Sequence, residues 1–135
     1  MKLVKVSDAS VLLTALFGTN DRVATRLDHL LHDTATEICM LPYTAIEFAN
    51  GVRFSTRNRD IAKQALTRFT QLKFHVTHLT PADIMTAVEL SYRLDTTVYD
   101  TSYHHVAIMQ DGVFITCDRN YYKKASHLGH IELWE

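Results

Sequence analysis

The sequence is poor in residues that interrupt or cross-link a chain. Its 135 residues include only four Gly, two Pro and two Cys. With so few breaks, it shows no linker, repeat or low-complexity segment. Cys39 and Cys117 lie in apolar stretches and belong to no C-x-x-C pair, which argues against a structural disulfide and against a cysteine-based zinc site.

The sequence also lacks long apolar runs. No run approaches the roughly 20 residues that a membrane-spanning helix needs. The first residues do not form the apolar stretch of a secretory signal peptide. We therefore expect a soluble cytoplasmic protein with no membrane partner.

An excess of either charge is missing as well. Fourteen basic and 15 acidic residues give a formal net charge of −1, so the whole molecule has no electrostatic signature of nucleic-acid binding. Any affinity for RNA must come from local basic residues. Surface Arg and Lys are common, so only their position near a functional site would be informative. The plausible set is Arg53, Arg57, Arg59, Arg119, Lys123 and Lys124.

The sequence is rich in short apolar segments. Hydrophobic residues make up 47% of the chain, enough to form the core of one compact domain over residues 1–135. Strand-like segments are predicted at residues 2–7, 38–41, 75–79, 113–116 and 131–134. Helices are predicted at residues 8–17, 23–31, 42–52, 61–72 and 100–110, and after Thr80, where Pro81 suits the first helical position. That last helix is expected to bury Ile84, Ala87, Val88 and Ser91. Pro42 is likewise expected at a first helical position, followed by Arg53, Arg57 and Arg59 in a polar turn.

Alternation of strands and helices predicts an α/β fold with a mainly parallel sheet between helices. Parallel neighbours need crossover connections, and their buried strands are continuous apolar runs. In such sheets ligands bind beyond the carboxyl ends of the strands, at a point where the strand order reverses. Asp8 and Asp118 both come just after predicted strands, so we expect them to line the functional site.

Four acids are candidates for a shared site. Asp8, Asp100 and Asp118 stand at the ends of predicted elements, and Glu47 stands inside the predicted helix 42–52. Each has a simple structural explanation, since Asp8 and Asp100 could cap helices and Glu47 could face solvent. The neighbours of Glu47 are apolar, however, and a carboxylate in such surroundings is costly unless it is paired or bound to a metal. We therefore expect the four acids to converge on Mg²⁺ or Mn²⁺, cations that prefer oxygen ligands.

The segments around these acids resemble motifs of the PIN-domain family, and specifically of the short VapC-type toxins of toxin–antitoxin modules. The similarity covers nearly the whole chain. It is carried by Val6-Ser7-Asp8-Ala9-Ser10, Ala45-Ile46-Glu47-Phe48, Tyr99-Asp100-Thr101-Ser102-Tyr103, Thr116-Cys117-Asp118-Arg119 and Leu79-Thr80. The chain departs from the family in His104-His105, where small or aliphatic residues are commoner, and in Ile-Glu-Phe in place of Ala-Glu-Leu.

The resemblance implies a PIN-like three-layer sandwich and a Mg²⁺- or Mn²⁺-dependent endoribonuclease. It also implies a homodimer inhibited by a cognate antitoxin. The apolar stretches 11–13 and 69–72 would suit either a dimer interface or the core. Asp8, Asp100 and Asp118 would hold metal. Glu47 would bind metal through water or orient the nucleophile, and Ser10 and Thr116 would support the metal ligands by hydrogen bonding.

Other functions explain the sequence less well. A zinc hydrolase would need an H-x-x-x-H pair on a helix, and we assign His104 no catalytic role. An aspartyl-phosphate phosphatase would need a second Asp at position 10, where the chain has Ser10, and a receiver domain would need acids where Lys5, Val6 and Ser7 stand. A catalytically silent PIN-like module that binds RNA or protein remains the alternative.

Overall fold

The computed structural model describes residues 2–18 and 20–135, and its centre is a sheet of five parallel strands. The strands are β1 (Leu3–Ser7), β2 (Thr36–Met40), β3 (His75–Val76), β4 (Val113–Thr116) and β5 (Ile131–Leu133). Their order across the sheet is β3-β2-β1-β4-β5, and every neighbouring pair is parallel. The predicted α/β fold is confirmed. The strand order reverses between β1 and β4, which makes their carboxyl ends the expected ligand site.

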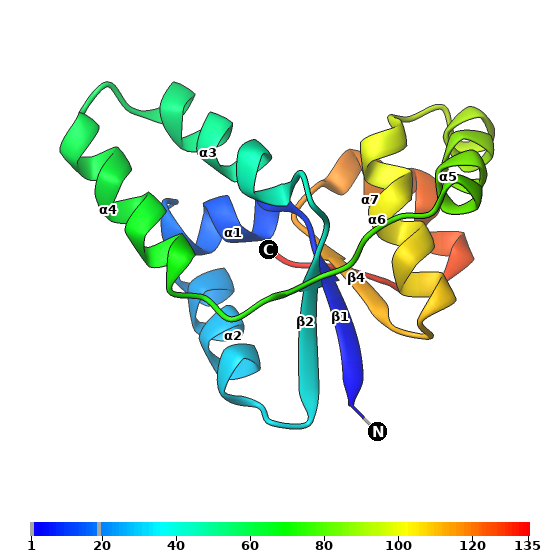
Figure 1. Ribbon diagram of the computed structural model, residues 1–135, viewed down its shortest axis with the longest axis horizontal. Coiled ribbons are helices and arrows are strands. Elements are labelled where there is room, and N and C mark those ends of the chain that lie inside the picture. The colour runs from blue at the N-terminus through cyan, green and yellow to red at the C-terminus, as the bar shows by residue number, and fades with distance from the viewer. Residues whose placement is uncertain (1, 19) are drawn as a thin grey trace.

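Helices cover both faces of this sheet (Figure 1). They are α1 (Ala9–Leu16), α2 (Asp21–His32), α3 (Thr44–Ser55), α4 (Arg59–Thr70), α5 (Pro81–Leu94), α6 (Val98–Met109) and α7 (Arg119–Ala125), followed by the 3₁₀ turn η1 (Ser126–Leu128). Helices α1 to α4 lie on one side and α5 to α7 on the other. None of the helices in the described ranges has the length and apolar character needed to span a bilayer.

Two hydrophobic cores separate the three layers. Consecutive strand residues point to opposite faces, so Phe114 packs with α6 and α7 whereas Ile115 packs with α1 to α4. Aromatic pairs fill each core: Tyr103 stacks on Phe114 with ring centroids 5.6 Å apart, and Phe48 stacks on Phe69 at 4.7 Å. Full burial of one such ring contributes about 1.5–3 kcal/mol. The cores thus fix the sheet between the helices that carry the four acids.

The start of α3 differs from the prediction. Pro42 is not its first residue, because Pro42 and Tyr43 form a turn and the helix begins at Thr44. The Leu41 N–H donates to Thr44 Oγ1 at 3.0 Å, which closes that turn. The helix also extends to Ser55, so Arg53 is helical and only Arg57 lies in the connection before α4.

Further details of one strand and two helices depart from the sequence patterns. Strand β3 has two residues instead of the five predicted. Helix α5 does begin at Pro81 under a Thr80 capping box, but Ile84 is 47% exposed and Leu90 is buried in addition to Ala87 and Ser91. Val88 is half-buried. Helix α7, between β4 and β5, was not predicted.

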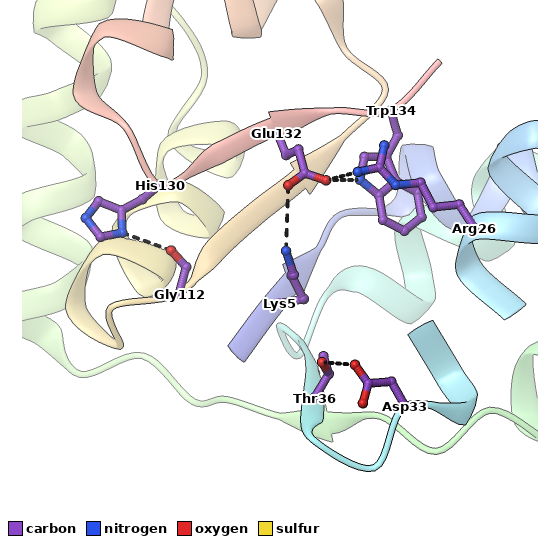
Figure 2. Close-up of polar contacts among 8 residues, drawn as sticks. All are labelled: Lys5, Arg26, Asp33, Thr36, Gly112, His130, Glu132 and Trp134. Carbon is purple, nitrogen blue, oxygen red and sulfur yellow. Dashed lines mark hydrogen bonds and ion pairs between the residues drawn. The ribbon is translucent and has the colours of Figure 1, made fainter. Parts of the chain in front are cut away.

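A polar cluster fastens the β5 edge to the rest of the molecule (Figure 2). Glu132 forms ion pairs with Lys5 of β1 and Arg26 of α2, and it accepts a hydrogen bond from Trp134 Nε1 at 2.9 Å. The Arg26 guanidinium lies 4.5 Å from the centroid of the buried Trp134 ring. Nothing in the sequence pattern had indicated this cluster, which joins three elements far apart in the chain.

Gly112 allows β4 to approach β1, and its replacement tests how tightly these strands must pack. A Cβ at position 112 would lie 2.4 Å from the Val4 carbonyl oxygen, a backbone atom that cannot move aside alone. We expect Gly112→Ala to lower the free energy of unfolding by about 1–3 kcal/mol, measured by urea denaturation.

Gly51→Ala is the matched control for Gly112→Ala. Its Cβ would meet only the mobile end of the Leu13 side chain, at 2.5 Å. Helix propensity gains about 0.8–1.0 kcal/mol from this change, so its net effect should be small. Equal effects of the two substitutions would show that the β1–β4 approach is not tightly constrained.

Candidate active site

The centre of the candidate site is Asp8, which directly follows β1 and caps α1 (the N-cap position). Its Oδ1 accepts hydrogen bonds from Ser10 Oγ at 2.5 Å, Ser10 N at 3.0 Å and Val11 N at 3.3 Å. Its Oδ2 accepts a hydrogen bond from Thr116 Oγ1 at 2.6 Å. The side chain is therefore held on both oxygens, and the residue is only 6% exposed.

The hydroxyls of Ser10 and Thr116 connect Asp8 to the end of β4. Ser10 Oγ accepts the Cys117 N–H at 2.9 Å while it donates to Asp8. Thr116 Oγ1 accepts the Asp118 N–H at 3.1 Å while it donates to the other Asp8 oxygen. Each hydroxyl uses its donor and its acceptor capacity. The backbone that carries Asp118 is thereby fixed relative to Asp8.

Glu47 lies in the first turn of α3 and faces α6. Its Oε1 accepts a hydrogen bond from the Tyr103 hydroxyl at 2.9 Å. Because the Tyr103 hydroxyl donates its one hydrogen bond to the carboxylate, it must accept a hydrogen bond from the Thr44 hydroxyl, 2.8 Å away. Burial is the main cause that raises the pKa of Glu47, and the hydrogen bond from Tyr103 opposes it.

Asp100 and Asp118 complete the acidic set. Asp100 is not the cap of α6, as one simple reading of the sequence had it, because Thr97 caps that helix and Asp100 lies in its first turn. Asp100 Oδ2 accepts from the hydroxyls of Thr96 at 3.2 Å and Thr97 at 3.1 Å. Asp118 caps α7, with its Oδ1 accepting from Tyr121 N at 3.0 Å.

The acids influence one another, and Asp100 lies at the centre of these effects. Its negative charge raises the pKa of Asp8 and of Glu47, and the charge of Asp118 raises the pKa of Asp100. Burial is the largest cause for all three groups, and it raises the pKa of Asp8 to about 6. In the described ranges, no ion pair links any of the four acids to a basic side chain.

This arrangement fits a hard divalent cation that keeps much of its water. Within the described part of the chain, Glu47 Oε2, Asp100 Oδ1 and Asp118 Oδ2 receive no hydrogen bond, so each is free to ligate. Across residues 2–18 and 20–135, no three His, Cys, Asp or Glu side chains are placed to ligate one ion together. Mg²⁺ uses only one or two carboxylates directly and reaches others through water. The set of donors is therefore suitable for Mg²⁺ or Mn²⁺.

The predicted basic residues form two separate groups. Arg53, Arg57 and Arg59 line a surface groove of about 800 Å³ at the α3–α4 turn, at the upper left in Figure 1. Along α3, Arg53 is six residues beyond Glu47, a rise of about 9 Å. The second group lies on α7 beside Asp118. There Arg119 pairs with Glu135, and Lys124 donates to the Asp95 carbonyl and lowers the pKa of Asp100. Lys123 is exposed on the same helix.

Several residues around the acids were missed or left without a role. Tyr103 could have been found, because it lies three residues after Asp100 and shares its helix face. His104 is fully buried away from solvent: its Nε2 donates to the Gly129 carbonyl, and its Nδ1 accepts from the Tyr121 hydroxyl, each at 2.7 Å. His105 contacts Asp83 at 2.9 Å. These two histidines hold α6 to α7 and to α5.

Residues 5–127 match the family model of the PIN domain. The chain belongs to the PIN domain family. No curated protein sequence matches it at a significant level.

Solved structures with similar folds agree with this assignment. PAE2754 from Pyrobaculum aerophilum has a TM-score of 0.71 and 22% identity, covering 96% of this chain and 83% of that one. A chain of VapBC2 from Rickettsia felis, bound to a DNA fragment from their promoter, has a TM-score of 0.72 and 14% identity, and the match covers 98% of this chain and 100% of that one. VapC20 from Mycobacterium tuberculosis, a Sarcin-Ricin loop cleaving toxin, has a TM-score of 0.68 and 17% identity, and the match covers 97% of this chain and 99% of that one. At these identities the likeness establishes the fold.

The raised pKa of Asp8 predicts how stability depends on pH in the metal-free PIN domain. Between about pH 4 and 6 the folded state holds a proton that the unfolded state has released. Stability is therefore lost as the pH rises through this range, by about 1.4 kcal/mol for each unit of pKa difference. In urea denaturation with chelator present, the contribution of Asp8 to the free energy of unfolding should thus be lower at pH 7.5 than at pH 4.5.

Asp8→Asn isolates that contribution, because Asn caps helices as well as Asp does and does not titrate. Subtracting its pH profile from that of the wild type removes the opposing effect of histidines such as His104, whose pKa burial lowers. Parallel profiles for the two proteins would show that Asp8 is ionised in the folded state at its ordinary pKa.

Proposed function

We propose that this PIN domain is a divalent-metal-dependent endoribonuclease, the toxin of a toxin–antitoxin pair. The observation that carries the proposal is the set of four carboxylates, two that follow β1 and β4 and two in the first turns of α3 and α6. Within the described ranges, three of them keep an oxygen that receives no hydrogen bond. The similarity in fold to VapC20, which is described as a loop-cleaving toxin, favours RNA as the substrate.

Asp8, Asp100 and Asp118 are the residues proposed to hold the metal, one or two of them directly and the rest through water, and Glu47 binds through water or orients the attacking water. A bound Mg²⁺ or Mn²⁺ would lower the pKa of water and stabilise the negative charge that develops during phosphodiester hydrolysis. The hydroxyls of Ser10 and Thr116 keep both Asp8 oxygens oriented. Glu47 is held through Oε1 by Tyr103, which leaves Oε2 to accept a proton from water.

The basic residues on either side of the acids are proposed to bind the phosphates of the RNA. Arg53, Arg57 and Arg59 would contact the RNA backbone on the α3–α4 side. Arg119, Lys123 and Lys124 would contact it on the α7 side. Contacts of this kind position the nucleic acid without reading its sequence, and they weaken with salt.

An antitoxin and a second copy of the chain are the proposed protein partners. The similarity in fold to chains of VapBC2 and of a toxin–antitoxin complex from Klebsiella pneumoniae supports the antitoxin. The second copy rests on the resemblance to VapC-type toxins alone. The apolar stretches 11–13 and 69–72 do not add to it, because they belong to the core. Val11 and Leu12 are fully buried, and Leu13, Phe69 and Leu72 pack against the same core. A basic antitoxin side chain over the acids would block the site.

Removal of single acids tests the site directly. We expect RNA cleavage in Mg²⁺ or Mn²⁺ that excess EDTA abolishes. Asp8→Asn, Asp100→Asn and Asp118→Asn should each reduce kcat by more than about 100-fold, with Glu47→Gln similar or milder. Ser10→Ala and Thr116→Val should lose about 10- to 100-fold, the usual cost of removing a side chain that orients a metal ligand.

Glu89→Gln, an exposed change on α5, is the control and should cleave normally. Cleavage is followed on a labelled RNA by gel electrophoresis. Undiminished cleavage in EDTA would contradict the metal mechanism. RNA binding without any cleavage under all metal conditions would favour a silent binding module.

Metal binding can be tested by stability, independently of cleavage. Asp100→Asn removes one charge from the cluster and keeps an oxygen that can accept from the Thr97 hydroxyl. Its melting temperature in EDTA should equal or exceed that of the wild type. Added Mn²⁺ should stabilise the wild type by RT ln(1 + [L]/Kd), about 2.7 kcal/mol at 100 times Kd, and the variant much less.

The opposite pattern would identify Asp100 as a structural residue. If Asp100→Asn is clearly destabilised in EDTA and both proteins respond equally to Mn²⁺, the carboxylate is needed for folding and does not hold metal.

A further inference from the structure

An exposed aromatic ring lies directly beside the acids. Tyr99 is in the first turn of α6, next to Asp100, and it is 59% exposed. Exposure alone means little, because Tyr92 on α5 is 81% exposed and lies in a helix that carries none of the acids. What distinguishes Tyr99 is its position and its support.

Tyr43 supports the Tyr99 ring from the side. The two rings meet edge to face, with centroids 5.3 Å apart and planes at 83°. Tyr43 is held in turn by its hydroxyl. Ser102 Oγ donates to the Tyr99 carbonyl at 2.6 Å, so Tyr43 is the donor in its own contact with Ser102. The Tyr99 ring is thus restrained on a rigid base while much of its surface stays open.

The same base continues into the candidate active site. Tyr43 also meets Tyr103 edge to face, with centroids 5.7 Å apart, and Tyr103 donates to Glu47. Tyr43 is also the residue that precedes α3, and its carbonyl accepts the N–H of Glu47 at 3.0 Å, so the two residues lie one helical turn apart. One connected set of side chains therefore joins the open ring to an acid of the site.

We propose that Tyr99, supported by Tyr43, is a stacking platform for one unpaired base of single-stranded RNA beside the cleaved bond. This rests on the proposed function. A nucleobase is neutral and flat, so the nearby carboxylates do not repel it as they repel phosphates, and it can cover one aromatic face. A restrained ring also loses little entropy on binding. Such stacking tolerates any base, so it fixes position along the strand and does not select a sequence.

The binding test uses a fluorescein-labelled, unstructured 12-nucleotide RNA in Mn²⁺, with Glu47→Gln as the background to slow cleavage. Anisotropy gives Kd. Tyr99→Ala should raise Kd about 5- to 150-fold, the range for loss of one stacked base. Tyr99→Phe keeps the ring and should stay within about 2-fold of the background. Tyr92→Ala is the matched control for an exposed tyrosine and should have no effect.

A series of RNAs with one abasic nucleotide locates the stacked base. Cleavage by the wild type should show a raised KM for an abasic nucleotide at one position next to the cut. In Tyr99→Ala that position should matter no more than the others. The two losses are then not additive, as expected when the base and the ring contact each other.

The outcomes separate this inference from the proposed function. If the wild type cleaves RNA but Tyr99→Ala keeps the background Kd and the same abasic profile, the platform is wrong and the nuclease stands. If the wild type neither binds nor cleaves RNA, the proposed function fails and the platform with it. If Tyr99→Ala weakens only the binding of a protein partner, the ring serves that partner and the proposal is overturned.

Discussion

The carboxylate of Asp8, held between the hydroxyls of Ser10 and Thr116, is the interaction on which the rest of the site depends. It spans β1 and β4, the two strands between which the sheet order reverses. The same hydroxyls accept the N–H groups of Cys117 and Asp118. A single buried group therefore fixes the direction in which the chain leaves β4, and with it the position of the second acid.

The energetic balance at Asp8 shows why this network is needed. Burial disfavours the charged carboxylate, whereas each hydrogen bond from Ser10, Thr116 and Val11 favours it. Burial prevails, and the pKa rises to about 6. Near neutral pH the group is thus mostly ionised, yet at a cost that a bound cation would remove. The protein is built to hold charge in place before a ligand neutralises it.

The sequence predicted those parts of the structure that follow from local patterns. Asp8 and Asp118 could be placed from strand ends alone, because the carboxyl ends of parallel strands lie on one side of a sheet. Asp100 was proposed from its place at a helix start and Glu47 from its apolar neighbours, and the family resemblance then assigned their roles. No periodicity links two residues more than 50 positions apart. The turn at Pro42 was mispredicted because a hydrogen bond from the Leu41 N–H to the Thr44 hydroxyl, invisible to propensity, sets the helix start.

The contacts of the aromatic residues could not have been predicted in the same way. Tyr43 meets Tyr99 and Tyr103 across two helices, and a pattern within either segment does not encode that meeting. Helix α7 was missed for a different reason. Asp118 caps that helix, but in the sequence it was interpreted only as an acid of the site.

Four helix N-termini converge where the four acids gather, and this explains how the charges coexist. Asp8 and Asp118 cap α1 and α7, and Glu47 and Asp100 lie in the first turns of α3 and α6. The N-terminal end of a helix carries partial positive charge and stabilises a nearby carboxylate by about 0.3–1 kcal/mol. Each acid thus receives its own compensation from backbone dipoles, and at Asp100, whose pKa burial raises, the charge of Lys124 acts in the same favourable direction. Since no basic side chain in the described ranges pairs with the acids, their free oxygens stay available to a cation. The fold supplies enough positive potential to assemble the cluster and leaves most of its charge for the ligand to neutralise.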